Sequence, residues 1–213
     1  RCNYPSAQVH EVGHHLNLNH ADKGTEPYGD KTCLMGYSYA APSTRMCFNA
    51  AKSWQLGWYG FSRASLNFSK RGGFNGQLIG INSYSSVGSA GKYTLVRVDS
   101  SNPSTSSVYV GFNNARGINS DVIDARNKVT VYTQFTYAKS FVVAELNPAQ
   151  EHVIASFEGG KALHVLVNSI NLASSPPVAD VDIFLDGCPP DAPCGPACNS
   201  CCANSDCSST NPC

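Results

Sequence analysis

The chain has 213 residues, of which 42% are hydrophobic and 14% are charged, so it can bury a core as one large domain or two small ones. Its formal net charge is zero and its longest basic run is Lys70-Arg71, which argues against nucleic acid or an anionic membrane as a partner. No apolar stretch approaches the ~18 residues that a membrane-spanning helix needs. Low charge with many Ser, Asn and Gly residues is typical of a secreted protein.

The chain begins at Arg1, with neither an initiator methionine nor a signal peptide. We therefore interpret it as a processed or truncated piece of a longer precursor. Three zones follow one another and differ in composition and hydrophobic period: residues 1–62, 72–187 and 188–213.

The first zone, residues 1–62, contains two predicted helices separated by a loop rich in Gly, Asp and Lys. Ala7–Leu18 lacks proline and predicts a helix. Its apolar residues recur at helical spacing: Val9, Val12 and Leu16. Phe48–Trp58 predicts the second helix, because Asn49 can cap its start and Gly57 can end it.

The second zone, residues 72–187, changes to short runs rich in Val, Ile, Tyr and Phe, separated by Gly, Pro, Asn and Ser. This spacing predicts an antiparallel β-sandwich or barrel. The predicted strands are Tyr93–Val98, Ser107–Phe112, Lys128–Phe135, Ser140–Leu146, His152–Phe157, Leu163–Ile170 and Ala179–Leu185. Tyr109 and Tyr132 fit core alternation as well as sugar stacking, and we interpret His152 and His164 as ordinary strand residues.

The third zone, residues 188–213, is dominated by cysteine. Seven of the ten cysteines lie there: Cys188, Cys194, Cys198, Cys201, Cys202, Cys207 and Cys213. Such density predicts a disulfide-rich tail in an oxidising compartment. The alternative, a zinc knuckle, requires more regular spacing and has no histidine available in this zone.

The stretch HEVGHHLNLNH, residues 10–20, carries the strongest chemical signal. Residues four apart lie on one face of an α-helix, so His10 and His14 can direct two imidazole nitrogens at one ion. Glu11 is rotated by about 100° from His10, so it flanks the ion and can hydrogen-bond a metal-bound water. The helix must end after Leu16 for His20 to return to the ion as the third ligand.

Asn17 stands where the known form of this pattern has glycine. A sharp helix exit usually places one residue at positive φ, which glycine adopts without steric cost. Asparagine is the best tolerated of the other residues there, with a penalty on the order of 1 kcal/mol. We therefore expect Asn17 to support the turn.

The histidine pattern is followed by CLMGYS, residues 33–38, and this order resembles the metzincin zinc endopeptidases, in which a methionine turn lies beneath the metal. Within that clan, HEVGHHLNLNHA, YGDKTCLMGYS and CFNAAKSWQLGWY resemble the gametolysin family, the matrix-degrading proteases of volvocine green algae. The resemblance covers Val9–Tyr59 well and the β-rich zone more loosely.

The resemblance implies a role for each motif residue. His10, His14 and His20 would bind one Zn²⁺, and Glu11 would act as general base on the zinc-bound water and then pass the proton to the leaving amine. Met35 would form the floor under the histidines. It also implies a fold: an α+β chain with the C-terminal half of a metzincin-type catalytic domain, an antiparallel β-sandwich-like domain and the disulfide-rich tail.

Several further residues of the first zone have two interpretations. Tyr37 lies at the offset from which some metzincin tyrosines reach the metal or the oxyanion, and ordinary packing is the alternative. Cys33 and Cys47 bracket the methionine turn, and a disulfide between them would tie it to the following helix. The acidic residues of the loop could bind calcium, although a solvated turn explains them more simply. These residues are Asp22, Glu26 and Asp30.

The function expected from the resemblance is a secreted zinc metalloendopeptidase that hydrolyses proteins or glycoproteins of an extracellular matrix or cell wall. Metzincins carry a mostly β upper half before the histidine motif, which nine residues cannot supply, so a separate N-terminal segment of the same precursor is a possible partner. The alternative is a non-catalytic structural or binding component of an extracellular assembly that carries a partial protease domain.

Overall fold

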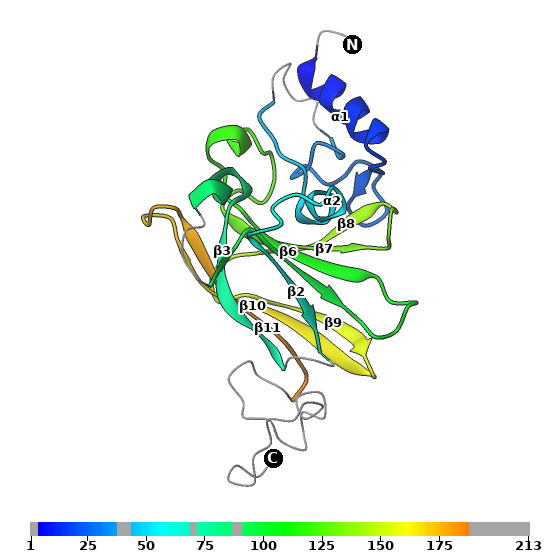
Figure 1. Cartoon of the computed structure of the whole chain (residues 1–213), viewed down its shortest axis with the longest axis vertical. Helices are drawn as coiled ribbons and strands as arrows, with labels where there is room; N and C mark the ends of the chain where they lie inside the picture. The colour runs from blue at the N-terminus through cyan, green and yellow to red at the C-terminus, as the bar shows by residue number, and fades with distance from the viewer. Residues whose placement is uncertain (1–3, 38–43, 69–71, 87–90, 188–213) are drawn as a thin grey trace.

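The computed structural model describes residues 4–37, 44–68, 72–86 and 91–187 (Figure 1). The cysteine-rich tail and Cys2 lie outside these residues. The helical elements are α1 (Pro5–His15), α2 (Ala50–Gln55), η1 (Ile81–Ser86) and η2 (Gly117–Asn119). The strands are β1 (Ala21–Asp22), β2 (Arg63–Asn67), β3 (Gly73–Ile79), β4 (Lys92–Tyr93), β5 (Leu95–Asp99), β6 (Ser107–Asn113), β7 (Lys128–Gln134), β8 (Ser140–Leu146), β9 (Glu151–Glu158), β10 (Lys161–Asn171) and β11 (Val178–Leu185).

Two sheets carry most of the β structure. The six-stranded sheet has the order β1-β8-β7-β6-β5-β2, and the five-stranded sheet has the order β4-β3-β11-β10-β9. Their facing side chains form one core, to which the first sheet contributes Val98, Val110 and Val131 and the second contributes Leu78, Leu163 and Val181. The β-rich zone is therefore a sandwich of two sheets.

The six-stranded sheet is covered on its other face by α2. Ala50 and Ala51 of this helix pack with Leu95, Tyr109 and Tyr132 in a second cluster of buried side chains. Because both faces of this sheet are covered, β6 and β7 are buried along most of their length instead of at alternate residues. This burial also shows that Tyr109 and Tyr132 are core residues and not exposed stacking platforms.

A third cluster lies beneath α1 and holds the loop after it. Its buried members are Leu18, Ala21, Cys33, Leu34, Met35, Met46, Phe48 and Val122. Figure 1 shows α1 at the end of the molecule beyond α2, away from the five-stranded sheet. The apolar residues that recur at helical spacing in α1 are exposed, since Val9, Val12 and Leu16 retain 41%, 52% and 47% of their accessible surface.

All seven strands predicted from the sequence are present, and both predicted helices form: α2 lies within its predicted range, whereas α1 begins two residues earlier and ends three residues earlier than predicted. Asn49 caps α2 as expected, because its side chain accepts a hydrogen bond from the backbone of Lys52. The antiparallel prediction is wrong at three edges, where β1–β8, β2–β5 and β3–β4 pair in parallel. Among the described residues, no helix has both the length and the apolar character to cross a membrane.

Candidate metal centre

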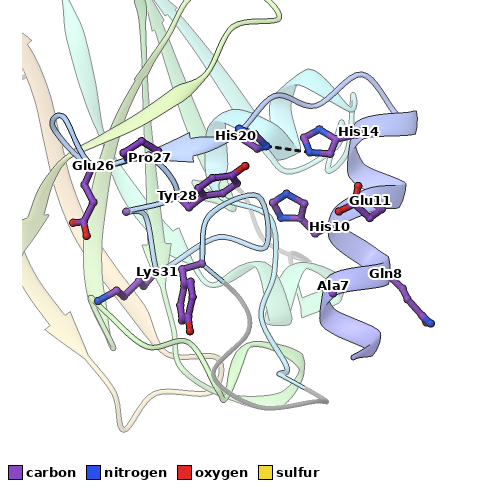
Figure 2. Close-up of a pocket in the computed structure, with 12 residues that line it drawn as sticks. Ala7, Gln8, His10, Glu11, His14, His20, Glu26, Pro27, Tyr28 and Lys31 are labelled. Carbon is purple, nitrogen blue, oxygen red and sulfur yellow. Dashed lines mark hydrogen bonds between the residues drawn. The ribbon is translucent and has the colours of Figure 1, made fainter. Parts of the chain in front are cut away.

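Three histidines from one helix and the turn after it converge at the end of the molecule that carries α1. His10, His14 and His20 each bring one ring nitrogen to within 4.8 Å of the others. His14 Nε2 lies 3.1 Å from His20 Nε2. Figure 2 shows the rings of His10 and His14 on the same side of α1, with His20 opposite them. Among the described residues, no other cluster of His, Cys, Asp and Glu has this metal-ligand arrangement.

The hydrogen bonds of two rings fix which nitrogen faces the cluster. His10 Nδ1 lies 2.7 Å from the carbonyl oxygen of Leu34, and His14 Nδ1 lies 2.9 Å from that of Leu18. A carbonyl oxygen can only accept, so each Nδ1 carries the proton and each Nε2 presents a lone pair. Metal-binding histidines are oriented in this way by a second hydrogen bond.

The geometry fits a small tetrahedral cation. Two nitrogens that bind one Zn²⁺ at about 2.05 Å in tetrahedral geometry lie about 3.3 Å apart, close to the 3.1 Å between His14 and His20. Burial lowers the pKa values of His10 and His20, and the neighbouring His14 lowers them further. Both effects favour the neutral rings that a metal ion requires.

The turn that returns His20 to the cluster is a Schellman motif. The backbone N–H of Asn17 donates to His14 O and that of Leu18 donates to Gly13 O, both at 2.9 Å. Asn17 adopts φ of 63°, in the left-handed region. Its carbonyl oxygen accepts a 2.6 Å hydrogen bond from Gln55 Nε2 at the end of α2, so the second helix holds the turn.

Met35 lies directly beneath α1. Its side chain is fully buried, and a Cβ added at Gly13 would overlap the methionine sulfur. A residue with a side chain at position 13 would therefore push α1 away from the methionine turn. The carbonyl that orients His10 belongs to Leu34, which is the residue before Met35. The turn thus supports the cluster both by packing and by hydrogen bonding.

Glu11 lies beside the histidines without joining their cluster. Its side chain is exposed and lines a cleft of about 1010 Å³ in front of α1. Figure 2 shows its carboxylate on the side of the helix that carries His10 and His14. The cleft is lined by Ala7, Gln8, His10, Glu11, His14, His20, Glu26, Pro27, Tyr28, Gly29, Lys31 and Tyr37. Tyr37, the tyrosine singled out from the sequence, is 44% exposed in this cleft.

The edge of the six-stranded sheet holds the third histidine. The backbone N–H of Ser140, the first residue of β8, donates to His20 O at 3.1 Å. Ala21, which follows His20, pairs with Ser140 in the parallel β1–β8 register. The N–H of Ala21 donates to Met35 O at 2.9 Å. No motif in the sequence signals this pairing, because the two strands are far apart in the chain.

Among the described residues, Asp22, Glu26 and Asp30 do not form a cluster of metal-ligating groups, and two of the three are not in a solvated turn. Asp30 is fully buried, and it accepts hydrogen bonds from Thr32 and from Asn49 Nδ2. Burial raises the pKa of Asp30 above its ordinary value. Asp22 is also buried and pairs with Lys139 at 2.8 Å, whereas Glu26 is exposed. The interpretation as a solvated turn is therefore wrong for Asp22 and Asp30.

The predicted Cys33–Cys47 disulfide is wrong for this structure, because both residues are free thiols. Their backbones are adjacent, since Leu34 N donates to Cys47 O at 3.1 Å. The sulfurs diverge: Cys33 Sγ accepts from Asn49 N at 3.2 Å, whereas Cys47 Sγ lies 4.0 Å from Ile118 O. Burial raises the pKa of each thiol to about 12, so neither is poised as a reactive thiolate.

His164 has a more polar environment than an ordinary strand histidine. Its Nδ1 lies 2.8 Å from Glu151 Oε1 and its Nε2 lies 2.6 Å from Asp186 Oδ1. Both ring nitrogens are thus occupied by carboxylates, and the ring stacks on Phe184 with a centroid distance of 4.9 Å. This arrangement stabilises an imidazolium and leaves no ring nitrogen for a metal ion.

Comparison with known proteins identifies the same part of the chain. Residues 3–136 match the model of the gametolysin peptidase M11 family. One curated relative, an autolysin of Chlamydomonas reinhardtii, is 40% identical over 50 residues, which are 24% of this chain and 8% of that protein. The chain therefore matches only a small part of that relative's length. No solved structure matches. Because the family model spans more than half of the chain and includes all three clustered histidines, the chain belongs to the gametolysin peptidase M11 family.

Proposed function

We propose that the chain carries the zinc-binding half of a metalloendopeptidase active site. The observation that carries this proposal is the convergence of three histidine nitrogens within 4.8 Å, two of them on rings whose Nδ1 atoms are already bound to carbonyl oxygens. Three neutral imidazoles are a donor set typical of a catalytic zinc site, which leaves a further position for water or substrate.

His10, His14 and His20 would hold the ion. When bound, Zn²⁺ supplies a water of lowered pKa and polarises the carbonyl of a peptide bond. Glu11 would take the proton from the attacking water and deliver it to the leaving amine, for which its position beside the ligand face is suitable. Asn17 and Met35 would keep the third ligand and the floor of the site in place.

A peptidase acts on proteins, and we propose proteins or glycoproteins of an extracellular matrix or cell wall as substrates. Family membership supports the peptidase class. The name of the Chlamydomonas relative, autolysin, is consistent with a protein that acts on material of its own organism. The proposal extends to a secreted location, consistent with the low charge and high cysteine content of the chain.

A second polypeptide segment is a further part of the proposal. Val9, Val12 and Leu16 form an exposed apolar stripe on α1, on a different face of the helix from the residues that line the cleft. A separate N-terminal segment of the same precursor would cover this stripe and complete the substrate cleft. The alternative, a non-catalytic component of an extracellular assembly, has no observation in its favour among the described residues.

The test is the metal content of the purified chain followed by a peptidase assay with and without a chelator. We expect one zinc per chain, and chelator-sensitive cleavage of a casein or gelatin substrate once the proposed N-terminal segment is added. Glu11→Gln should retain the zinc and lower kcat by about 10²- to 10⁴-fold, the range for loss of a general base.

Each arm has a distinct contrary result. If the wild-type chain holds no stoichiometric zinc, the proposed metal centre is wrong. Zinc without cleavage, even after addition of the N-terminal segment, would support the non-catalytic alternative. Full cleavage by Glu11→Gln would show that the base has been misassigned.

A further inference from the structure

The tyrosine that contacts the histidine cluster is Tyr28, which no motif in the sequence identifies. Its ring centroid lies 4.2 Å from that of His20 and 6.0 Å from that of His10. Figure 2 shows Tyr28 on the wall opposite α1, with its hydroxyl directed toward the three histidines. A phenol in this place can donate a hydrogen bond to an oxygen that binds in front of the cluster.

The backbone of Tyr28 is held by two independent contacts. Its N–H donates to Asp22 Oδ1 at 2.9 Å, and its carbonyl oxygen accepts from the N–H of Tyr37 at 2.9 Å. Asp22 is buried and is paired through its other oxygen with Lys139 at 2.8 Å. The sheet edge and the methionine turn therefore both fix the position from which the Tyr28 side chain projects.

The conformation of Tyr28 also has a cost that these contacts offset. Its φ of 60° lies in the left-handed region, which a bulky residue rarely adopts. Such conformations persist only where the surroundings enforce them, and they concentrate at ligand-binding and catalytic sites. The result here is a half-exposed phenol that lies against a proposed metal ligand and faces a cleft.

We propose that Tyr28 is a catalytic residue of this site, in addition to Glu11. Its ring limits the movement of His20, and its hydroxyl donates a hydrogen bond to the carbonyl oxygen of the peptide bond as negative charge develops there. The phenol remains protonated throughout, so no proton leaves it. This inference rests on the proposed peptidase function, and it assigns to Tyr28 the donor role that the sequence resemblance suggests for Tyr37.

The two parts of Tyr28 can be separated by substitution in the full chain. Tyr28→Phe removes the hydroxyl and keeps the ring, so the affinity for zinc should remain within roughly twofold while kcat falls by about 100-fold, as for loss of one oxyanion donor. Tyr28→Ala also removes the ring contact with His20. It should weaken zinc binding by about 10-fold, the lower range for residues that orient a ligand.

A binding measurement makes the result independent of turnover. A peptide phosphoramidate, whose tetrahedral anionic oxygens resemble the transition state, should bind the zinc-loaded Tyr28→Phe chain about 100-fold more weakly than the wild type. The absorption spectrum of the Co²⁺-substituted chain should be the same for both, because the hydroxyl does not hold the metal. Tyr28→Ala should alter that spectrum.

Two variants serve as comparisons. Tyr137→Phe is the matched control, since Tyr137 has φ of 58°, is exposed and lies in the β7–β8 loop outside the histidine cleft. It should bind the phosphoramidate like the wild type. Tyr37→Phe tests the rival donor in the same cleft, and its effect should be smaller than that of Tyr28→Phe.

The outcomes distinguish this inference from the proposed function. Wild-type zinc binding and phosphoramidate binding, with Tyr28→Phe indistinguishable from wild type, would overturn the role of Tyr28 and leave the peptidase proposal intact. A 100-fold loss in Tyr37→Phe alone would transfer the role to Tyr37. Failure of the wild-type chain to bind zinc would instead overturn the proposed function.

Discussion

The two sheets of the sandwich share one core but differ on their outer faces. In the six-stranded sheet, β7 is buried along most of its length because α2 covers the outer face. In the five-stranded sheet, β11 alternates between buried and partly exposed residues, and its Asp180 and Asp182 bind polar side chains of β3 and β10. The first sheet thus continues into the metal centre through β1 and α2, whereas the second ends in a polar surface.

The β-rich zone therefore supports the candidate site and is not only a domain attached to it. The edge strand β8 donates to His20 O, and Lys139, the residue before β8, neutralises Asp22. Asn49 bridges the two parts through Asp30 and Ser140, at 2.9 and 3.0 Å. Substitutions on the first sheet should therefore change metal binding, while those on the second should change only stability.

The largest effect is expected from loss of a proposed ligand. His20→Ala should lower zinc affinity by more than about 100-fold, beyond the range for residues that only orient ligands. The matched change in the second sheet, His164→Ala, should leave zinc affinity unchanged because both nitrogens of His164 already bind carboxylates. Competition with a chromophoric chelator measures the zinc affinity of both variants. Equal losses of zinc affinity would contradict the expectation that only the first sheet supports the metal centre.

Truncation of a core side chain in the second sheet should lower stability and leave zinc affinity unchanged. Leu163 is fully buried in β10 between the two sheets, so Leu163→Ala should lower the free energy of unfolding by about 2–5 kcal/mol. Zinc affinity measured on the folded chain should remain that of the wild type. Urea unfolding with the metal removed gives the first quantity, and a coupled loss of zinc affinity would indicate that the second sheet also shapes the site.

The ion pair at the edge of the first sheet is the next test. Lys139→Met leaves the buried Asp22 carboxylate without its cation, so we expect the segment from His20 to Tyr28 to loosen and zinc affinity to fall by about 10-fold. Lys23→Met is the control, because Lys23 and Lys139 are similarly exposed, at 47% and 42%, whereas the partner of Lys23, Glu145, is 20% exposed and Asp22 is only 6% exposed. Exposed pairs contribute about 0–1 kcal/mol, so this control should change zinc affinity little.

The turn at Asn17 should be sensitive to side-chain shape. Asn17→Val places a β-branched residue at φ of 63° and should lower the free energy of unfolding by roughly 1–2 kcal/mol. Asn17→Gly should remain within about 0.5 kcal/mol of the wild type, because easier turn geometry is offset by greater freedom of the unfolded chain. Equal stability of the Val and Gly variants would show that the turn imposes no left-handed requirement.

The smallest effect is a pH dependence in the second sheet. Partial burial lowers the pKa of His164, but the hydrogen bonds that its ring donates to Asp186 and Glu151 outweigh this effect and leave the pKa above its ordinary value. The stabilisation is therefore complete below the pKa of the unfolded state and is lost as the pH rises through the folded pKa. His164→Gln should lower Tm by about 1–2 °C at pH 5 and by less at pH 9.

Calorimetry at the two pH values measures this difference. Buffers of matched ionic strength are needed, because exposed ion pairs are screened by salt. A larger deficit at pH 9 than at pH 5 would contradict the assigned direction of the His164 pKa.

Much of the fold could be predicted because the signals are local. Alternating or continuous apolar runs predicted seven strands, and the capping residue Asn49 marked the start of α2. The strands missed by the sequence analysis, β1 to β4, are short or contain glycine, and all four lie in parallel edge pairs. Such pairs depend on partners distant in the chain and leave little pattern in a single sequence.

The candidate site divides in the same way. The spacing of His10 and His14 on one helix by itself determined that their rings share a face, and the chemistry of asparagine allowed the turn at position 17. Only the tertiary structure decided that Asp30 is buried, that the Cys33 and Cys47 thiols diverge, and that Tyr28 lies against His20. The physical reason is that helix periodicity and turn propensity act over a few residues, whereas burial and side-chain direction depend on segments that β8 and α2 bring together from far along the chain.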